Sequence, residues 1–481
     1  MSDLIRFILN GQLREVSGLP PTMTLLQYLR GPAHLCGTKE GCAEGDCGAC
    51  TVMAGRIEAD GTARYRSINA CIALLPSLDG RQIVTVDYLR DIAGGDLHPV
   101  QRAMVDCHAS QCGFCTPGFV MAITNELHNN PAADDTAVQD AIAGNLCRCT
   151  GYRPILDAAR RAKDLPRVDI PLDSDALRGL TRAKMFAYES AEGKFFAPVT
   201  PQELADVLAQ YPNAYMLSGG TDVGLWVTKF HMDLPVIVYT GNIAALRDVS
   251  ETAEGLEIGA AVTYSEAFAA LAKQGAGMED LLRRLGSAHI RNAGTLGGNI
   301  ANGSPIGDGP PPLMALQAEI VLRSAAGTRR LPLEKFFIAY KKQDRKPGEF
   351  LEKIIVPKRA DSTLFVTYKV SKRFDQDISA VCAGFALDID GGIIRAARLC
   401  YGGMAGTPKR AENAETALVG KAWSRESLAA AMAAMDADFT SMSDMRASAE
   451  YRQSVAKNLL KRFFIETTLP QVKTGVYRHA G

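Results

Sequence analysis

The chain contains 481 residues, 47% of them hydrophobic and 22% charged, with 53 basic and 53 acidic side chains. This composition is typical of a globular protein of roughly three or four domains, and the balanced charge gives no indication of binding to nucleic acid or to an anionic membrane. The sequence has neither a run of about 18 apolar residues nor a long apolar stretch at its N-terminus, so we expect no membrane span and no signal peptide. Twelve cysteines without a secretory signal favour reduced, metal-binding thiols in a cytoplasmic protein.

Residues 1–88 are expected to form a small mixed sheet with one helix. Ile5, Phe7 and Leu9 alternate with polar residues as in a half-buried strand, and Asn10-Gly11 is a two-residue hairpin signal. The return strand is predicted at 13–16, a helix at 24–30, and further strands at 51–53, 65–70 and 82–86. This pattern is typical of a ferredoxin-like β-grasp domain.

A glycine-rich loop in this domain carries three closely spaced thiols. Cys42, Cys47 and Cys50 follow the spacing Cys-x4-Cys-x2-Cys, and Cys71 comes after a predicted strand. This is the ligand pattern of a plant-type 2Fe–2S cluster. The intervening glycines suit a loop whose N–H groups point at sulfur, because only glycine takes positive φ angles without strain. A disulfide loop and a zinc knuckle are the alternatives; they are disfavoured because disulfides occur mainly in secreted chains and zinc sites use paired Cys-x2-Cys units.

Residues 89–165 are predicted to be helical and contain a second set of thiols. Helices are expected at 98–109, at 117–128 with Thr116 as the N-cap, at 136–142, and from Pro154 onward. Two thiol pairs lie just before helices, where the partial positive charge of a helix N-terminus stabilises thiolates; they are Cys112 with Cys115 and Cys147 with Cys149. Four thiols in two pairs suit zinc or a second 2Fe–2S cluster.

The remaining chain is expected to hold a linker at 166–190, an α+β domain at 191–360, and a C-terminal α+β domain at 361–481. In the third domain, residues 218–224 form a glycine-rich turn after a strand, which lets backbone N–H groups approach a phosphate. Taken alone, this segment is better interpreted as a plain turn. A second glycine-rich segment at 291–302, followed by polar residues to 308, changes that interpretation, because two such loops suit a long ligand with a pyrophosphate and a polar ring system. Thr263 and Glu266 are spaced as a helix capping box.

Three cysteine segments together resemble the iron–sulfur half of the molybdenum hydroxylases, a family that includes xanthine dehydrogenase, aldehyde oxidase and carbon monoxide dehydrogenase. These segments are Gly-Cys-Ala-Glu-Gly-Asp-Cys-Gly-Ala-Cys-Thr-Val, Gln-Cys-Gly-Phe-Cys-Thr-Pro-Gly and Asn-Leu-Cys-Arg-Cys-Thr-Gly-Tyr. The resemblance implies two 2Fe–2S clusters, one on each set of four thiols. The other cysteines, Cys36, Cys107, Cys382 and Cys400, are interpreted as buried or bystander thiols.

The two glycine-rich segments resemble the flavin domain of the same family, which implies bound FAD. By position, Gly219, Gly220, Thr221 and Asp222 are expected around the pyrophosphate, and Thr295, Asn299, Asn302 and Asp308 around the rest of FAD. Leu351 is expected beside the flavin and Lys369 near the isoalloxazine. Lys372 and Arg373 are expected on the side where NAD docks, and no side chain is expected to act as a catalytic nucleophile or base.

The resemblance implies an electron-transfer role with the molybdenum site on another chain. We expect a molybdopterin-binding large subunit as partner, in a dimer of heterodimers, because residues 1–481 leave no room for that domain. This arrangement looks like the small subunit of bacterial xanthine dehydrogenase, which implies electron transfer through both clusters to FAD and NAD during oxidation of hypoxanthine or xanthine to urate. The alternatives are the same module serving an aldehyde or another N-heterocycle, and a non-enzymatic iron–sulfur protein.

Overall fold

The computed structural model describes residues 3–58, 60–472 and 474–475, and the chain divides into two compact units. Unit 1 comprises Met1–Asp248, Thr263–Glu266 and Gly286–Thr295, and unit 2 comprises Val249–Val262, Ala267–Leu285 and Leu296–Gly481. Both units combine helices and sheets, which confirms the expected α+β multidomain class. In the part of the chain that the structure describes, no helix combines the length and the apolar character needed to cross a membrane.

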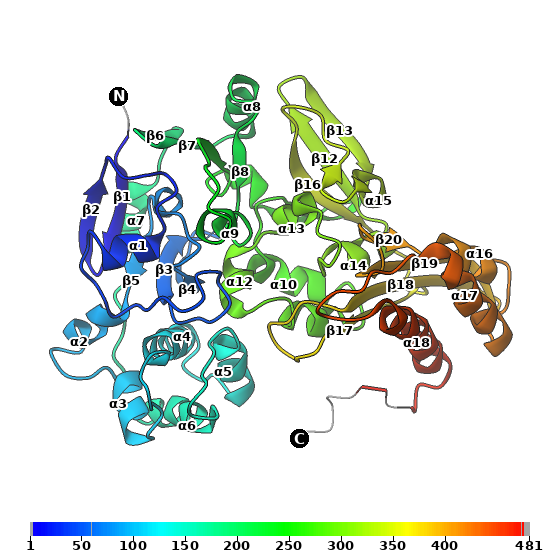
Figure 1. Ribbon diagram of the computed structural model, residues 1–481, viewed down its shortest axis with the longest axis horizontal. Helices are drawn as coiled ribbons and strands as arrows, with labels where there is room; N and C mark the ends of the chain where they lie inside the picture. The colour runs from blue at the N-terminus through cyan, green and yellow to red at the C-terminus, as the bar shows by residue number, and fades with distance from the viewer. Residues whose placement is uncertain (1–2, 59, 473, 476–481) are drawn as a thin grey trace. The chain divides into compact units, whose positions relative to one another are not determined.

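Unit 1 begins with a five-stranded sheet. Its strands are, in order, β2 (Gln12–Val16), β1 (Ile5–Leu9), β5 (Gln82–Val84), β3 (Thr51–Ile57) and β4 (Ala63–Asn69). The β1–β2 hairpin turns at Asn10 and Gly11, whose φ angles of 50° and 76° are those of a type I′ turn. Helix α1 (Leu25–Arg30) begins after the N-cap Thr24 and packs its apolar side on this sheet, where Leu29 and Phe7 share one core (Figure 1). The predicted β-grasp domain is therefore confirmed.

A group of helices follows this sheet. They are α2 (Leu89–Ile92), α3 (Pro99–Asp106), α4 (Thr116–Asn129), α5 (Asp135–Ile142) and α6 (Arg153–Ala162). Helices α3 to α6 pack together, and Phe119 and Ile155 share a buried core with Met53 and Tyr65 of the sheet (Figure 1). The four-helix domain and the β-grasp sheet thus form one packed body.

The rest of unit 1 contains a second, four-stranded sheet. Its elements are α7 (Ser174–Leu180), β6 (Phe186–Ser190), β7 (Gly193–Ala197), α8 (Pro201–Gln210), β8 (Tyr215–Leu217), α9 (Val223–Thr228), β9 (Val236–Tyr239) and α12 (Ala288–Ala293). The strand order is β6-β7-β9-β8, and β9 runs parallel to both of its neighbours. Phe186 and Phe195 of this sheet lie in the same core as Phe7 of the first sheet. The glycine-rich residues 218–224 therefore follow a strand that is anchored to the β-grasp domain.

Unit 2 contains a five-stranded sheet and a four-stranded sheet. The first consists of β10 (Val249–Glu251), β11 (Gly255–Gly259), β16 (Phe350–Pro357), β12 (Glu319–Ser324) and β13 (Gly327–Pro332), and β14 (Phe337–Ala339) and β15 (Lys342–Gln343) form a hairpin. The accompanying helices are α11 (Met278–Arg283), α13 (Leu296–Asn302), α14 (Pro310–Ala315) and α15 (Leu333–Phe336). The chain passes from unit 1 to unit 2 within α10 (Tyr264–Ala272) and again at the start of α13.

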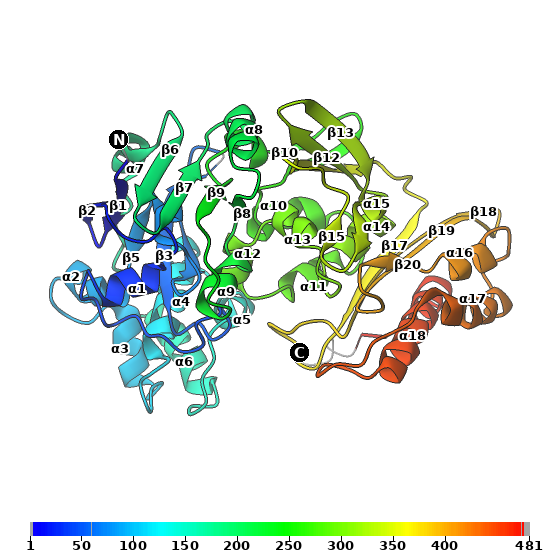
Figure 2. The ribbon, with the colours of Figure 1, turned by 45° about the horizontal axis from the view of Figure 1, so that its top comes forward.

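The four-stranded sheet and three helices complete unit 2. The strands are β17 (Leu364–Val370), β18 (Val381–Asp390), β19 (Ile393–Gly402) and β20 (Lys409–Arg410), and the helices are α16 (Glu412–Leu418), α17 (Arg425–Asp438) and α18 (Ala449–Thr468). The three helices cover one face of the sheet, where Phe385, Tyr401 and Phe463 are buried together (Figure 2). Alternate residues of a strand point to opposite faces, and Gly384 accordingly contacts Pro312 of α14.

Some predicted element limits are wrong. Thr116 is not an N-cap, because α4 already includes Thr116 and Cys115 is its N-cap. The helix expected at 98–109 spans only Pro99–Asp106, with His98 as the N-cap. The segment 166–190 contains α7 and β6, and its role as a linker stays a prediction. The expected domain boundaries at 88, 165, 190 and 360 stay predictions.

Candidate cofactor sites

The first thiol set, Cys42, Cys47, Cys50 and Cys71, lies on the loop before β3 and just after β4. Backbone N–H groups of this loop point at sulfur: Cys42 N lies 3.3 Å from Cys47 Sγ, and Glu44 N and Asp46 N lie 3.4 and 3.2 Å from Cys42 Sγ. Gly45 and Gly48 have φ angles of 78° and 67°, which a residue with a side chain rarely adopts. The loop is thus shaped to present N–H donors to negatively charged sulfur.

The four thiols of the first set contact one another. Hydrogen bonds from Cys47 and Cys71 lower the pKa of the Cys42 thiol, and hydrogen bonds to Cys42 and Cys50 raise the pKa of Cys71. Cys50 and Cys71 are buried, whereas Cys42 and Cys47 are partly exposed. All twelve cysteines are free, so no disulfide closes this loop. The thiols and the inward N–H groups fit the four ligands of a 2Fe–2S cluster.

The second thiol set, Cys112, Cys115, Cys147 and Cys149, lies before the N-termini of α4 and α6. Burial, followed by a hydrogen bond with Cys147, raises the pKa of Cys115 to about 12, and a hydrogen bond with Cys112 raises the pKa of Cys149. Thr150 donates its N–H to Cys147 Sγ at 3.4 Å. Across the described residues, no three His, Cys, Asp or Glu side chains are grouped as ligands of one metal ion. The thiol contacts are instead pairwise, as expected where each iron of a binuclear cluster takes two thiolates.

The loops that carry the two thiol sets are bonded to each other. Leu146, which directly precedes Cys147, donates its N–H to the carbonyl of Cys47 at 3.0 Å. The amide of Asn145 donates to the carbonyl of Gly48 at 3.0 Å and to Thr51 Oγ1 at 3.1 Å. Each bond joins a residue beside one thiol set to a residue beside the other, so one backbone hydrogen bond and two bonds from the Asn145 side chain fix the spacing of the sets.

His289 completes this junction, and sequence reasoning missed it. Thr51 donates its only hydroxyl proton to the carbonyl of Gly48 at 2.6 Å, so the Nε2 of His289, 3.0 Å from Thr51 Oγ1, must be the donor in that bond. Complete burial, followed by the charge of Arg291, lowers the pKa of His289 to about 4. A single histidine in an otherwise ordinary segment has no spacing signal, so the sequence could not indicate this role.

The first glycine-rich loop, residues 218–224, lies between β8 and α9 in unit 1. A Cβ at Gly219 would lie 1.9 Å from the carbonyl oxygen of Ala293, so only glycine lets this loop contact the second glycine-rich segment. Gly220 has a φ of 74°. The hydroxyl of Ser218 is buried and has no hydrogen-bond partner among the described residues. It is therefore suited to donate a hydrogen bond to a phosphate oxygen. Asp222 accepts a hydrogen bond from Trp226 Nε1 at 3.1 Å.

The first thiol set lies next to this loop. Ile72 follows Cys71 directly, and its carbonyl oxygen would lie 2.7 Å from a Cβ at Gly224 and 3.2 Å from one at Gly220. Thr228 of α9 donates to the carbonyl of Ala43 at 2.7 Å. The structure therefore brings together the first thiol set and the loop expected to bind the FAD pyrophosphate.

The other expected flavin residues lie in unit 2, apart from Thr295, which belongs to unit 1. Lys369 of β17 is almost fully buried and donates to Asp308 at 2.5 Å, and Ser379 donates to the other Asp308 oxygen at 2.6 Å. The two charged residues that sequence reasoning assigned separately to FAD thus bind each other. Among the rest, Asn299 and Asn302 lie on α13, Leu351 is buried in β16, and Arg373 is half-exposed beside Asp377.

Four family models match consecutive parts of the chain. They are described as a 2Fe-2S iron-sulfur cluster binding domain (residues 7–75), a [2Fe-2S] binding domain (85–160), an FAD binding domain in molybdopterin dehydrogenase (187–359) and a CO dehydrogenase flavoprotein C-terminal domain (366–467). Xanthine dehydrogenase of Emericella nidulans is 31% identical over 96% of the chain. The chain belongs to the molybdenum hydroxylase family. It corresponds to the iron–sulfur and FAD part of that family.

Two further matches agree with this assignment. Xanthine dehydrogenase/oxidase of Rattus norvegicus is 31% identical over 96% of the chain. The chain spans 38% of the length of the Emericella protein and 39% of the rat protein. A solved chain of carbon monoxide dehydrogenase from Hydrogenophaga pseudoflava is similar with a TM-score of 0.53 and 27% identity, over 56% of this chain and 94% of that chain. The chain is therefore a 2Fe–2S and FAD electron-transfer module of this family.

Replacing one exposed thiol tests the assignment of the two sets. Cys149→Ser should remove one of two 2Fe–2S signals from the electron spin resonance spectrum of the reduced protein, together with half of the iron, because the sets share no ligand. Cys36→Ser is the matched control, since Cys36 is also exposed but belongs to neither set. Loss of both signals from a chain that keeps its circular dichroism spectrum would contradict the assignment.

The burial of His289 predicts a pH-dependent stability. Its pKa is about 4 in the folded chain and about 6.5 in an unfolded one, so its contribution is complete above pH 6.5 and is lost as the pH falls toward 4. We expect about 1 kcal/mol of this loss between pH 7.5 and 5.5, measured as the free energy of unfolding in urea. In His289→Gln, the free energy of unfolding should fall less steeply as the pH falls. Burial also lowers the pKa of His98 to about 4, but His98 contributes equally to both proteins. Equal slopes for the two proteins would refute the prediction.

Proposed function

We propose that the chain is the electron-transfer component of a xanthine dehydrogenase, passing electrons from a molybdenum-containing partner to NAD. The observation that carries the proposal is the series of direct contacts in unit 1: the second thiol set is bonded to the first through Leu146 and Cys47, and the first contacts residues 218–224 through Ile72. When bound, 2Fe–2S clusters supply one-electron steps, and FAD links these to the two-electron hydride chemistry of NAD. The chain's own residues hold these groups in a fixed order.

The second thiol set is the proposed entry point for electrons. Cys112 and Cys149 are exposed, whereas Cys50 and Cys71 of the first set are buried. The side chains of Phe114 and Tyr152, close in sequence to these thiols, are 49% and 37% exposed. Exposed aromatic side chains are typical of the centre of a protein interface. We assign this surface to the molybdopterin-binding partner, in a dimer of heterodimers.

FAD is assigned to the glycine-rich residues and to the polar residues named from the family pattern. Gly219, Gly220, Thr221 and Asp222 would hold the pyrophosphate, with the unpartnered Ser218 hydroxyl as an additional donor. The remaining proposed contacts are Thr295, Asn299, Asn302, Asp308, Leu351 and Lys369. The positive charge of buried Lys369 is already balanced by Asp308. In this assignment the pair therefore orients the flavin more than it changes the charge around it.

NAD is the proposed acceptor, and Lys372 and Arg373 are the proposed contacts for its pyrophosphate. The side chain of Arg373 is 53% exposed and lies 3.7 Å from Asp377, whose side chain is 20% exposed. Its guanidinium also donates to the carbonyl of Gln376 at 3.1 Å. Arginine suits bidentate phosphate recognition. All thiols are free, which fits the proposed cytoplasmic location because that compartment keeps thiols reduced.

The substrate distinguishes this proposal from its alternatives. An aldehyde or another N-heterocycle remains compatible with the same module, because substrate residues belong to the proposed partner. The non-enzymatic iron–sulfur protein is disfavoured, since such a protein has no use for an FAD domain spanning residues 187–359.

Purification of the tagged chain from its own cells, with its natural partner, tests the proposal. We expect a molybdenum-containing polypeptide to co-purify and the complex to reduce NAD⁺ when xanthine is added, with no reduction in its absence. Molybdenum with activity toward an aldehyde or a quinoline and none toward xanthine would select the alternative substrate. A pure chain without molybdenum or NAD⁺ reduction would contradict the proposal.

A further inference from the structure

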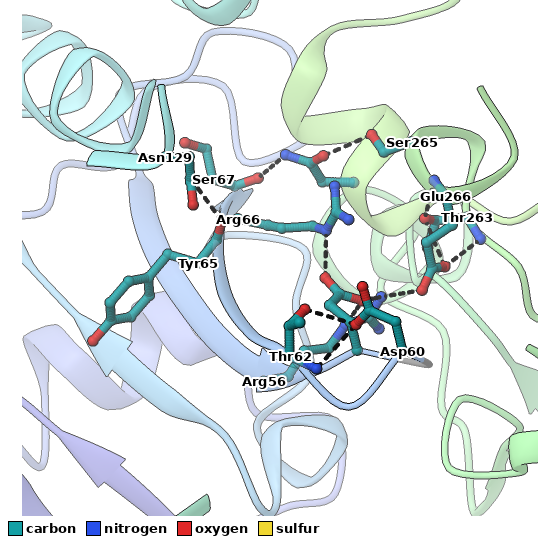
Figure 3. Close-up of polar contacts among 12 residues, drawn as sticks. Arg56, Asp60, Thr62, Tyr65, Arg66, Ser67, Asn129, Thr263, Ser265 and Glu266 are labelled. Carbon is teal, nitrogen blue, oxygen red and sulfur yellow. Dashed lines mark hydrogen bonds and ion pairs between the residues drawn. The ribbon is translucent and has the colours of Figure 1, made fainter. Parts of the chain in front are cut away.

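A buried network of charges lies in unit 1 and contains none of the thiols. Its members are Arg56 and Glu58 near the end of β3, Arg66 of β4, Arg247, and Glu266 of α10. Figure 3 labels Arg56, Arg66 and Glu266. Glu58 binds Arg66 at 2.7 Å, Arg56 at 3.0 Å and Arg247 at 3.3 Å. Glu266 binds Arg56 at 2.6 Å and Arg247 at 2.9 Å. All five side chains are at most 19% exposed, so solvent screens these pairs little.

Glu266 uses its two carboxylate oxygens in different directions. Oε1 accepts from Arg56 and Arg247. Oε2 instead accepts from the N–H and the hydroxyl of Thr263, each at 2.8 Å (Figure 3). The N–H of Glu266 donates back to Thr263 Oγ1 at 3.2 Å, which completes a capping box. Burial opposes ionisation, but Arg56 and Arg247 lower the pKa of Glu266 to about 2. One charged carboxylate therefore connects strand β3 to Thr263.

Thr263 is in turn bonded to the second glycine-rich segment. Thr263 lies opposite Thr295 in an isolated antiparallel bridge, and the bond on the unit 1 side of this bridge is donated by the N–H of Tyr264 to the carbonyl of Gly294 at 3.0 Å. Gly294 lies against the side chain of Thr221 in the first glycine-rich loop. The chain of contacts thus runs from Arg56 through Glu266 and Thr263 to the residues proposed to bind FAD.

A second connection reaches the same place. Asn292 donates to the carbonyl of Ser67 in β4 at 3.0 Å and accepts from the hydroxyl of Ser265 at 2.7 Å (Figure 3). Thr263–Glu266 and Gly286–Thr295 belong to unit 1, although the segments on either side of each belong to unit 2. Strands β3 and β4 are bonded to both of these short segments, through Arg56 to Glu266 and through Ser67 to Asn292.

We propose that Glu266 is a positioning residue that holds the loop at 293–295 for FAD, so that flavin affinity depends on Arg56 in the iron–sulfur domain. The proposal rests on the assignment of FAD to this chain. Removing the charge of Glu266 leaves Arg56 and Arg247 with a single shared carboxylate, which is costly for buried ions, and it weakens the bonds that hold Thr263. Glu58 shares the same arginines but makes no bond to residues 263–266, so it supports the network without holding the loop.

This difference provides a matched pair of variants. In the full chain with its clusters, we expect Glu266→Gln to raise the dissociation constant for FAD about tenfold, equivalent to about 1.4 kcal/mol. Glu58→Gln removes the same charge from the same network and should change that constant less than twofold, even where it lowers the unfolding temperature. The measurement is a titration of the FAD-depleted protein followed by quenching of flavin fluorescence, with iron content as the check on the clusters.

The FAD affinities of the variants distinguish a positioning role of Glu266 from a general effect on the charge network. Equal loss of FAD affinity in the two variants, or unchanged affinity in a folded Glu266→Gln protein, would overturn the positioning role. If Glu266→Gln does not fold, Thr263→Val decides, because it removes the hydroxyl bonds to Glu266 while every charge stays paired; it should weaken FAD severalfold, and wild-type affinity would overturn the proposal. Failure of the unaltered protein to bind FAD would instead refute the proposed flavin function.

Discussion

The fixed spacing in unit 1 depends on hydrogen bonds made by the loop that carries the first thiol set. On one side the carbonyls of Cys47 and Gly48 accept from Leu146 and Asn145, and on the other the carbonyl of Ala43 accepts from Thr228. These partners come from the helical domain and from the flavin part of the chain. Backbone carbonyls accept all of these bonds, and the donors are the Leu146 N–H and the short side chains of Asn145 and Thr228. The two thiol sets and residues 218–224 are therefore held in register without long flexible side chains.

The buried polar side chains that bind this loop are uncharged. Thr51, Asn145 and His289 are buried and bind each other or the carbonyl of Gly48. Each of these buried side chains thus has at least one partner, while Asn145 Oδ1 and His289 Nδ1 have none among the described residues. His289 remains neutral because burial disfavours its charged form. The charged groups are kept elsewhere, in the Arg56–Glu266 network, where each carboxylate meets more than one arginine. Hydrogen bonds between uncharged groups thus join the cluster loops, and ion pairs join strands β3 and β4 to Arg247 and Glu266.

The sequence predicted the features that short-range rules govern. The cysteine spacings indicated both thiol sets, Asn10-Gly11 indicated the hairpin, and Thr263 with Glu266 indicated a capping box. Long-range contacts were not predictable in the same way: nothing in the local sequence shows that Glu266 also binds Arg56, that Lys369 is paired with Asp308, or that His289 reaches Thr51. The position of Cys115 as an N-cap was missed because Thr116-Pro117 is the stronger local signal.

The most direct test is whether the first thiol set, which lies between residues 218–224 and the second thiol set, also passes electrons between the second cluster and the flavin proposed to bind those residues. Bound flavin is photoreduced by a light pulse, and the clusters are followed by freeze-quench electron spin resonance in the wild-type chain and in Cys71→Ala. The account predicts that both clusters become reduced in the wild type, and that in Cys71→Ala, with the first cluster absent and the second intact, the second cluster stays oxidised on the same time scale. Reduction of the second cluster at the wild-type rate in Cys71→Ala would contradict it.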